Sequence, residues 1–345
     1  MKILYFGNIL SGHGYTPTVI ESLSRLLNCG DIRVYTSSNK KNKVLRLLDM
    51  IYFFFSRKKG TDVVLIDTYS TMNFWYAAII AMLSNLFNIK YIPILHGGKL
   101  PERLDKSPYV SKKIFMNSAM NVAPSGYLYK EFCARGYKNT TIIHNFINEN
   151  NYKPIKRKPI VVPRLLWVRS FSEVYNPIMA VMLLGELKKK YPDATLLMIG
   201  GYGGGRECFD NTLSKAVALG LDDSIEFTGK LSKEEWIERS KECNIFINTT
   251  NADNTPVSVI EAMALGLPVV STNVGGIPYI IDDGVDGLLV APNDINAMVE
   301  CVHKLTSDVR LFDNIIENSI KKSQSFYSSS VKENWITLLY KIINK

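Results

Sequence analysis

The fold is decided by the stretch from Asn251 to Tyr279, which reads NADNTPVSVIEAMALGLPVVSTNVGGIPY. A polar loop leads to Pro256, where a proline suits the start of a helix, and an apolar segment of helical character follows. The run from Pro268 to Ser271 has the composition of a short buried strand. With the preceding strand, Ile245 to Asn248, these elements predict one repeating unit of a parallel sheet.

Two acidic residues and two glycines give this stretch its chemistry. Asp253 lies in the loop and Glu261 in the second turn of the helix, and both are expected to face a pocket at the start of the helix. Unpaired amides at a helix start favour an anion such as a diphosphate, and carboxylates suit sugar or ribose hydroxyls. Gly275 and Gly276 let the backbone approach a ligand closely. A loop Asp beside a helix is equally often a simple cap.

Outside this stretch, short apolar runs alternate with longer amphipathic segments, which predicts parallel sheets covered by helices on both faces. Amphipathic helices are expected at 16–27, 74–87, 177–190 and 331–343. A polar, proline-containing segment at 148–163 is typical of a linker between domains. We therefore predict an α/β protein with domains at 1–150 and 151–325, and a final helix in 326–345 that packs back on the first domain. The predicted strands are 3–6, 32–35, 63–66, 91–95, 120–123, 141–143, 165–168, 194–199, 225–227, 245–248 and 268–271.

The composition is that of a globular protein, with 46% hydrophobic and 21% charged residues. The five cysteines are scattered and show no metal-ligand spacing, which argues for a reducing compartment. The apolar run at the N-terminus is too short for a signal peptide. The apolar segment Met72 to Ile89 is interrupted by Asn and Ser and is expected to be a buried helix. We therefore expect a cytoplasmic protein.

The positive charge is concentrated in the first half of the chain. Residues 1–150 hold 19 Lys and Arg against 9 Asp and Glu. The segment Lys40 to Lys59 has basic ends around an aromatic, apolar centre. This pattern suits peripheral binding to the anionic inner face of the cell membrane. A core helix with solvated ends is the alternative. No recognition motif supports binding to nucleic acid.

Extended to Val290, the opening stretch resembles the donor-binding signature of retaining glycosyltransferase family 4. The signature has two acidic residues with seven residues between them. Ala, Gly and Pro then follow at fixed positions. This chain carries it at Asp253, Glu261, 262–264, 266–270, 275–276 and 283–287, and further matches lie at 123–125, 142–145, 167–169, 192–201 and 227–231. The resemblance covers nearly the whole chain. It implies the GT-B fold, in which two Rossmann-like, doubly wound domains face each other across a cleft, and the type of enzyme that assembles bacterial surface polysaccharides.

The resemblance also implies roles for individual residues. Arg169 is expected to bind the donor diphosphate, Asp253 the transferred sugar and Glu261 the ribose. The other implied donor contacts are Gly12, Gly14, Asn176, Gly229, Lys230, Thr255, Ser258, Val259, Gly275 and Gly276.

Three positions depart from the family pattern. Asp253 and Tyr279 replace Glu, and the Lys that usually follows the diphosphate-binding Arg is missing between Ser170 and Asn176. Tyr175 or Asn176 is expected in the place of that Lys, or another cation such as Arg206 is expected to assist.

The first half supplies weaker signals. Gly12 and Gly14 follow the first strand and suit a phosphate or an acceptor, although an ordinary turn explains them equally well. His96 follows the fourth strand; a lone histidine is more often structural, but the resemblance places one beside the reacting sugar. Lys99 and Arg103 either bind an anionic acceptor or are simply solvated.

The resemblance implies the reaction. A hexose-type sugar would move, with retention and without a metal, from a UDP- or GDP-sugar to a hydroxyl of a glycan or lipid-linked glycan. The donor is a substrate, and no cofactor is expected. The alternatives are a nucleotide-sugar epimerase on the same fold and a non-catalytic partner subunit.

Overall fold

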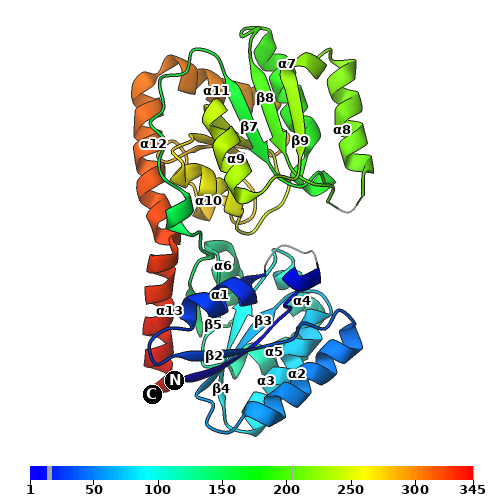
Figure 1. Cartoon of the computed structure of the whole chain (residues 1–345), viewed down its shortest axis with the longest axis vertical. Helices are drawn as coiled ribbons and strands as arrows, with labels where there is room; N and C mark the ends of the chain where they lie inside the picture. Colours follow the sequence, from blue (N-terminus) through cyan, green and yellow to red (C-terminus); the bar gives the residue numbers. More distant parts are fainter. Residues whose placement is uncertain (14–17, 204, 345) are drawn as a thin grey trace. The chain divides into compact units, whose positions relative to one another are not determined.

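The computed structural model describes residues 1–13, 18–203 and 205–344, and the chain forms two compact units (Figure 1). Unit 1 comprises Met1–Asn145 with Ser328–Lys345, and unit 2 comprises Phe146–Tyr327. Each unit contains a six-stranded, wholly parallel sheet. The prediction of a two-domain, doubly wound α/β protein is confirmed.

The sheet of unit 1 has the strand order β2-β1-β3-β4-β5-β6. Alternate residues of its strands point to opposite faces, so Leu4 and Phe6 contribute to a core on one face while Tyr5 points to the other. The strands are β1 (Lys2–Phe6), β2 (Arg33–Ser37), β3 (Val63–Thr68), β4 (Lys90–Leu95), β5 (Asn121–Ala123) and β6 (Thr140–Ile142).

Helices cover this sheet in two groups. The core that contains Phe6 is formed with α2 (Lys43–Arg57), α3 (Asn73–Leu86), α4 (Leu100–Lys106), α5 (Pro108–Met116) and α6 (Gly126–Ala134). Helix α1 (Val19–Leu27) packs against the C-terminal helix α13 (Ser328–Ile343). The Nζ atom of Lys90 donates to the carbonyl oxygen of Ile342 at 2.8 Å, which ties the end of α13 to β4.

The sheet of unit 2 has the order β12-β11-β10-β7-β8-β9. The strands are β7 (Arg164–Val168), β8 (Thr195–Ile199), β9 (Ile225–Gly229), β10 (Ile245–Asn248), β11 (Val269–Thr272) and β12 (Leu288–Val290). The helices are α7 (Pro177–Lys188), α8 (Glu207–Ala218), α9 (Lys233–Arg239), α10 (Val257–Ala264), α11 (Ile295–Ser307) and α12 (Val309–Ser323).

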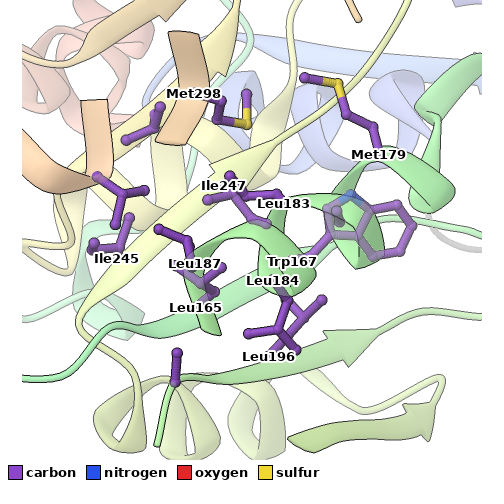
Figure 2. Packing of buried hydrophobic residues seen from close by; sticks show 14 of the residues in the cluster. Leu165, Trp167, Met179, Leu183, Leu184, Leu187, Leu196, Ile245, Ile247 and Met298 are labelled. Carbon is purple, nitrogen blue, oxygen red and sulfur yellow. The ribbon is translucent and has the colours of Figure 1, made fainter. Parts of the chain in front are cut away.

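Two cores sandwich this sheet. On one face Leu165, Trp167 and Ile247 pack with the leucines of α7 and with Met298 of α11 (Figure 2). On the other face Leu166 and Phe246 pack with α9 and α10. Because residues of β7 alternate between the two cores, its carboxyl end is held rigidly from both sides.

The predicted elements agree with the structure to within a few residues, with two differences. Strand β12 was not predicted, because its three residues were interpreted only as the end of the donor-binding signature. The segment Met72 to Ile89 was expected to be a buried helix, but only one side of α3 is buried, and Met72, Trp75, Met82 and Leu86 are exposed. No helix among the described residues is long and apolar enough to cross a membrane.

Candidate functional site

An ion pair joins the loops that follow β7 and β10. The Nη2 atom of Arg169 lies 2.5 Å from Oδ2 of Asp253, and both side chains are mostly buried. The ring centroid of Tyr175 lies 4.9 Å from the guanidinium carbon, so the cation also rests on an aromatic face. Of the two residues predicted for the place of the missing Lys, Tyr175 is the one in contact with Arg169. The pair therefore presents a fixed, planar cation at the carboxyl edge of the sheet.

Hydrogen bonds fix the loop that carries Asp253. The amide of Asn251 donates to the carbonyl oxygen of Val174 at 2.7 Å, and Thr272 Oγ1 donates to the carbonyl oxygen of Thr250 at 2.6 Å. The Oδ1 atom of Asp253 accepts from the amide of Asn254 at 2.8 Å. The loop is thus braced by the segment that follows β7 and by the end of β11, which holds Asp253 in place for Arg169.

Glycines make this close packing possible. A Cβ atom on Gly276 would overlap the carbonyl oxygen of Asn254, and one on Gly200 would overlap that of Arg169. Gly275 has a φ of +55°, and a Cβ there would overlap the carbonyl oxygen of Asp253. The glycine pair therefore admits the backbone of the Asp253 loop, a role the sequence analysis did not foresee. Its contact with a ligand stays a prediction.

Two hydroxyl groups lie near the start of α10. Oγ1 of Thr255 and Oγ of Ser258 are buried and have no hydrogen-bond partner within the described ranges. The Ser258 residue is 8% exposed. A buried hydroxyl without a partner is costly unless something else satisfies it, and here both lie at a helix start, where amides also favour an anion. The predicted contact Val259 differs: its side chain is in the core, and its amide donates to the carbonyl oxygen of Pro256 at 3.1 Å.

Glu261 is held in a second buried network. Its side chain is 4% exposed, its Oε1 atom accepts from the hydroxyl of Tyr152 at 2.5 Å, and it forms an ion pair with Lys233. Lys233 also donates to the Tyr152 hydroxyl at 2.9 Å. Burial raises the pKa of Tyr152, which keeps the hydroxyl protonated as a donor. Glu261 is therefore oriented by two donors from elements distant in sequence.

Lys233 and Tyr152 were missed by the sequence analysis. A signal for Lys233 was present, because Ser232 and Glu235 form a capping box that marks the start of α9 directly after β9. A basic residue at that start lies at the same edge of the sheet as Asp253. For Tyr152, no local pattern indicated its contact with α10, since it lies 109 positions from Glu261.

The remaining predicted donor residues of unit 2 differ in their surroundings. The side chain of Asn176 caps α7 and donates to Oδ1 of Asn293 at 2.8 Å, so it is occupied by structural bonds. Gly229 ends β9 with a φ of +72°, and its carbonyl oxygen accepts from the amide of Gly200 at 2.9 Å. Lys230 is exposed beside it. Arg206 lies directly before α8 and pairs with Asp210 in the first turn of that helix at 3.0 Å.

In unit 1, a polar network surrounds His96. Nε2 of His96 lies 2.9 Å from Oδ1 of Asp67, and the Tyr5 hydroxyl donates to the same oxygen at 2.8 Å. Because a carboxylate only accepts, Nε2 of His96 carries hydrogen and the tautomer is fixed. The His96 ring stacks on the Tyr69 ring, with 4.6 Å between the ring centroids. Burial raises the pKa of the Tyr69 hydroxyl, and the nearby charge of Asp67 raises it further. Asp67, an acid at the end of a buried apolar strand, was the signal for this network, and the sequence analysis did not use it.

The other residues of unit 1 that were predicted to bind a ligand follow His96 in the sequence or lie in the turn after β1. Lys99 is exposed at the start of α4, and Nε of Arg103 donates to the carbonyl oxygen of Ser70 at 2.7 Å. Gly12 lies in a short helical turn, Ser11–His13. Gly14 lies outside the described residues.

Comparison with solved structures identifies the class of fold. The sucrose-phosphate synthase of Thermosynechococcus elongatus aligns over 100% of this chain and 99% of its own, with a TM-score of 0.81 and 17% identity. Anabaena Alr3699/HepE, solved in complex with UDP and glucose, aligns over 99% of this chain and 100% of its own, with a TM-score of 0.74 and 16% identity. The two parallel sheets and these similarities define a GT-B fold.

The family follows from the sequence. The model for Glycosyl transferases group 1 matches residues 148–322, and the chain belongs to this family. A D-inositol 3-phosphate glycosyltransferase of Mycobacterium sp. (strain KMS) is 30% identical over 141 residues, which are 41% of this chain and 32% of that protein. A glycosyltransferase of Haemophilus influenzae is 29% identical over 154 residues, 44% of this chain and 42% of that protein. The matched part spans less than half the length of either relative.

Proposed function

We propose that this chain is a retaining glycosyltransferase that moves a hexose-type sugar from a UDP- or GDP-sugar to a hydroxyl of a glycan or lipid-linked glycan. The observation that carries the proposal is the occurrence in unit 2 of the Arg169–Asp253 pair and of two buried hydroxyls at the start of α10 that have no partner in the described part of the chain. Membership of the Glycosyl transferases group 1 family supports it.

In this proposal the donor diphosphate binds between Arg169 and the first amides of α10. A planar guanidinium that rests on Tyr175 presents parallel N–H donors, which suit phosphate oxygens. The hydroxyls of Thr255 and Ser258 would donate to the same group and gain the partners they lack within the described residues. In this arrangement Asp253 accepts hydrogen bonds from hydroxyls of the transferred sugar, and Glu261 accepts hydrogen bonds from the ribose hydroxyls.

The transfer step balances without a protein base. The bond from the sugar C1 atom to the leaving phosphate oxygen breaks, and a bond from C1 to the acceptor oxygen forms on the same face. The proton of the acceptor hydroxyl passes to the leaving phosphate oxygen. Negative charge grows on that phosphate in the transition state, so a fixed donor such as Arg169 is worth roughly a hundredfold in rate. The position of His96 beside the reacting sugar remains a prediction.

The reaction is proposed to need no metal ion. Arg169 and the helix start are proposed to replace a divalent cation at the diphosphate, and the structural neighbour solved with UDP and glucose is consistent with a nucleotide-sugar donor. We also propose that Lys99 and Arg103 bind the acceptor. The proposed location is cytoplasmic, with a peripheral contact to anionic membrane through Lys40 to Lys59. Surface-polysaccharide assembly is the proposed setting.

A defined incubation tests this function. The purified chain is mixed with UDP- and GDP-sugars and a panel of glycan acceptors, and the products are followed by NMR with and without EDTA. The expected result is an acceptor-dependent product with the anomeric configuration of the donor, formed equally in EDTA. Conversion of the donor without an acceptor would show an epimerase, and an inverted product would exclude the retaining mechanism.

A further inference from the structure

Helix α3 contains no charged residue, and one of its sides is open. Phe74, Ala77 and Ile80 are buried in the unit 1 core, whereas Trp75, Met82 and Leu86 are exposed, Met82 by 63%. Positions 75, 79, 82 and 86 recur at helical spacing, so the exposed residues form one continuous apolar stripe. A continuous apolar stripe of this kind marks an interaction surface more strongly than single exposed residues do.

A groove of about 370 Å³ runs between α3 and α5. Most residues of its walls are apolar or aromatic, among them Trp75, Ala78, Met82, Tyr109 and Val110, and the polar ones include Asn85 and Asn117. The only charged residue among the groove's described walls is Lys113, whose Nζ lies 4.4 Å from the ring centroid of Tyr109. The volume is within the range of small-ligand sites, roughly 300–1,000 Å³. The groove is therefore large enough for an apolar chain and has a cation beside it.

Helix α2, which packs beside α3 (Figure 1), extends the apolar surface. Val44, Leu48, Tyr52 and Phe55 lie on its exposed side, and Tyr52 is 74% exposed. Phe55 meets Phe87, at the end of α3, edge to face at 5.7 Å. The stripes of the two helices thus join through an aromatic contact.

Charge on this side of unit 1 is almost entirely positive. Within α2, α3 and α5 the one acidic residue is Asp49, which accepts a hydrogen bond from Ser37 at 3.3 Å. Two basic residues of the Lys40 to Lys59 segment have structural roles: Arg46 is buried, and Arg57 stacks on Tyr35 at 4.7 Å. The exposed lysines at the ends of α2 and on α5 are Lys40, Lys41, Lys43, Lys59, Lys112 and Lys113.

We infer that the outer faces of α2, α3 and α5 dock on an anionic lipid bilayer and that the groove between α3 and α5 takes one hydrocarbon chain of a lipid. Apolar stripes flanked by lysines match the boundary between acyl chains and anionic headgroups. The inference rests on the proposed function in one respect: the membrane contact proposed for Lys40 to Lys59 is extended to α3 and α5. Its test needs neither donor nor acceptor, so it can fail or succeed independently of sugar transfer.

Trp75 provides the readout, because Trp167, Trp236 and Trp335 are all buried. The full chain is titrated with phosphatidylglycerol vesicles whose acyl chains carry bromine, which quenches tryptophan at contact. We expect the emission of Trp75 to shift to shorter wavelength and to fall at least about twofold. Phosphatidylcholine vesicles should bind at least about tenfold more weakly, since each lysine near an anionic surface contributes roughly fivefold.

Three variants separate the groove from the rest of the surface. Met82→Glu should weaken vesicle binding about tenfold or more, while Ala78→Phe, which fills the groove, should keep binding but lose most of the quenching. Val217→Glu on α8, at a site 58% exposed in unit 2, is the matched control and should change neither. Quenching that is unaltered in Ala78→Phe and Met82→Glu would overturn the inference. So would a dimer of the wild-type chain that Met82→Glu converts to monomer without lipid.

Discussion

The guanidinium of Arg169 and the carboxylate of Asp253 lie 84 positions apart in the sequence and form an ion pair of 2.5 Å at the carboxyl edge of the unit 2 sheet. A carboxylate so close to a cation competes with any anionic ligand for it. Asp253 and a donor diphosphate would therefore share Arg169, and the two residues should respond differently to substitution.

Asp253→Asn should separate nucleotide binding from sugar transfer. Removing the charge of Asp253 leaves Arg169 fully available, so UDP or GDP should bind as tightly as in the wild type or up to about tenfold more tightly. Transfer should fall by about a hundredfold or more, because an uncharged amide oxygen replaces the carboxylate that accepts from the sugar hydroxyls. Calorimetry with the free nucleotide and a transfer assay measure the two effects. Weaker nucleotide binding together with normal transfer would refute this division of roles.

Arg169→Lys should reduce transfer by roughly ten- to a hundredfold although it keeps the charge. A lysine lacks the planar fork that rests on Tyr175 and meets phosphate oxygens in pairs. Tyr175→Phe keeps the ring and serves as the matched control, with a rate within about twofold of the wild type. Equal rates for Arg169→Lys and the wild type would show that the guanidinium geometry is unimportant.

Lys233 and Glu261 should be energetically coupled in the absence of any ligand. The Glu261 side chain is 4% exposed, so removal of its cation in Lys233→Met leaves a buried carboxylate that keeps its hydrogen bond from Tyr152. We expect the free energy of unfolding to fall by about 1–3 kcal/mol. Urea denaturation of Lys233→Met, Glu261→Gln and the double variant gives the coupling, expected at about 1–2 kcal/mol. Additive effects of the two substitutions would mean that the ion pair contributes nothing.

Gly276→Ala should destabilise the protein by more than about 2 kcal/mol, because the new Cβ atom would overlap the carbonyl oxygen of Asn254. Gly185→Ala is the matched control in the same unit. Gly185 lies within α7, and a Cβ there would meet Leu221 and Leu219 at ordinary distances of 3.6 and 3.7 Å. That substitution should raise stability by about 0.5–1 kcal/mol. Similar melting temperatures for both variants would contradict the packing described for Gly276.

His144 should make unit 1 sensitive to mild acid. Burial lowers the pKa of His144 from its ordinary value of 6.5, and Nδ1 contacts the carbonyl oxygen of Pro124 at 3.1 Å. The unfolded chain therefore binds a proton at a higher pH than the folded chain, and stability should decrease as the pH falls below about 6.5. Melting temperatures of the wild type and His144→Gln between pH 5 and 8 check this. The substitution should flatten the acid side of the curve, and parallel curves would exclude His144 as the cause.

Much of the fold could be predicted from sequence because the strands are short apolar runs separated by helical segments and turns. The strand Ile245–Asn248 was predicted without error, and β7 within one residue. Strand β12 was not predicted, because Leu288–Val290 was interpreted only as the end of the donor-binding signature. The exposed side of α3 was missed because a helix with Trp, Ile, Met and Leu on both sides has the same composition whether it is buried or half-open.

The candidate site was predictable only in part. The sequence placed Asp253 and Glu261 near the start of α10, since spacing along one loop and helix is a local property. The partners of these residues are not local: Arg169 and Tyr152 reach them from positions 84 and 109 residues away. The glycine pair shows the same limit. The ligand contact of Gly275 and Gly276 stays a prediction, and their packing against the carbonyl oxygens of Asp253 and Asn254 had no local signal in the sequence.

Donor binding by wild-type protein and by Glu261→Gln tests the central claim most directly. Thermal melting is measured with UDP-, GDP-, ADP- and dTDP-sugars, because a ligand at a hundred times its Kd adds about 2.7 kcal/mol of stability. We predict that a UDP- or GDP-sugar raises the melting temperature of the wild type by several degrees and that Glu261→Gln loses this shift. No shift with any nucleotide sugar, or an undiminished shift in Glu261→Gln, would contradict the assignment of unit 2 as the donor site.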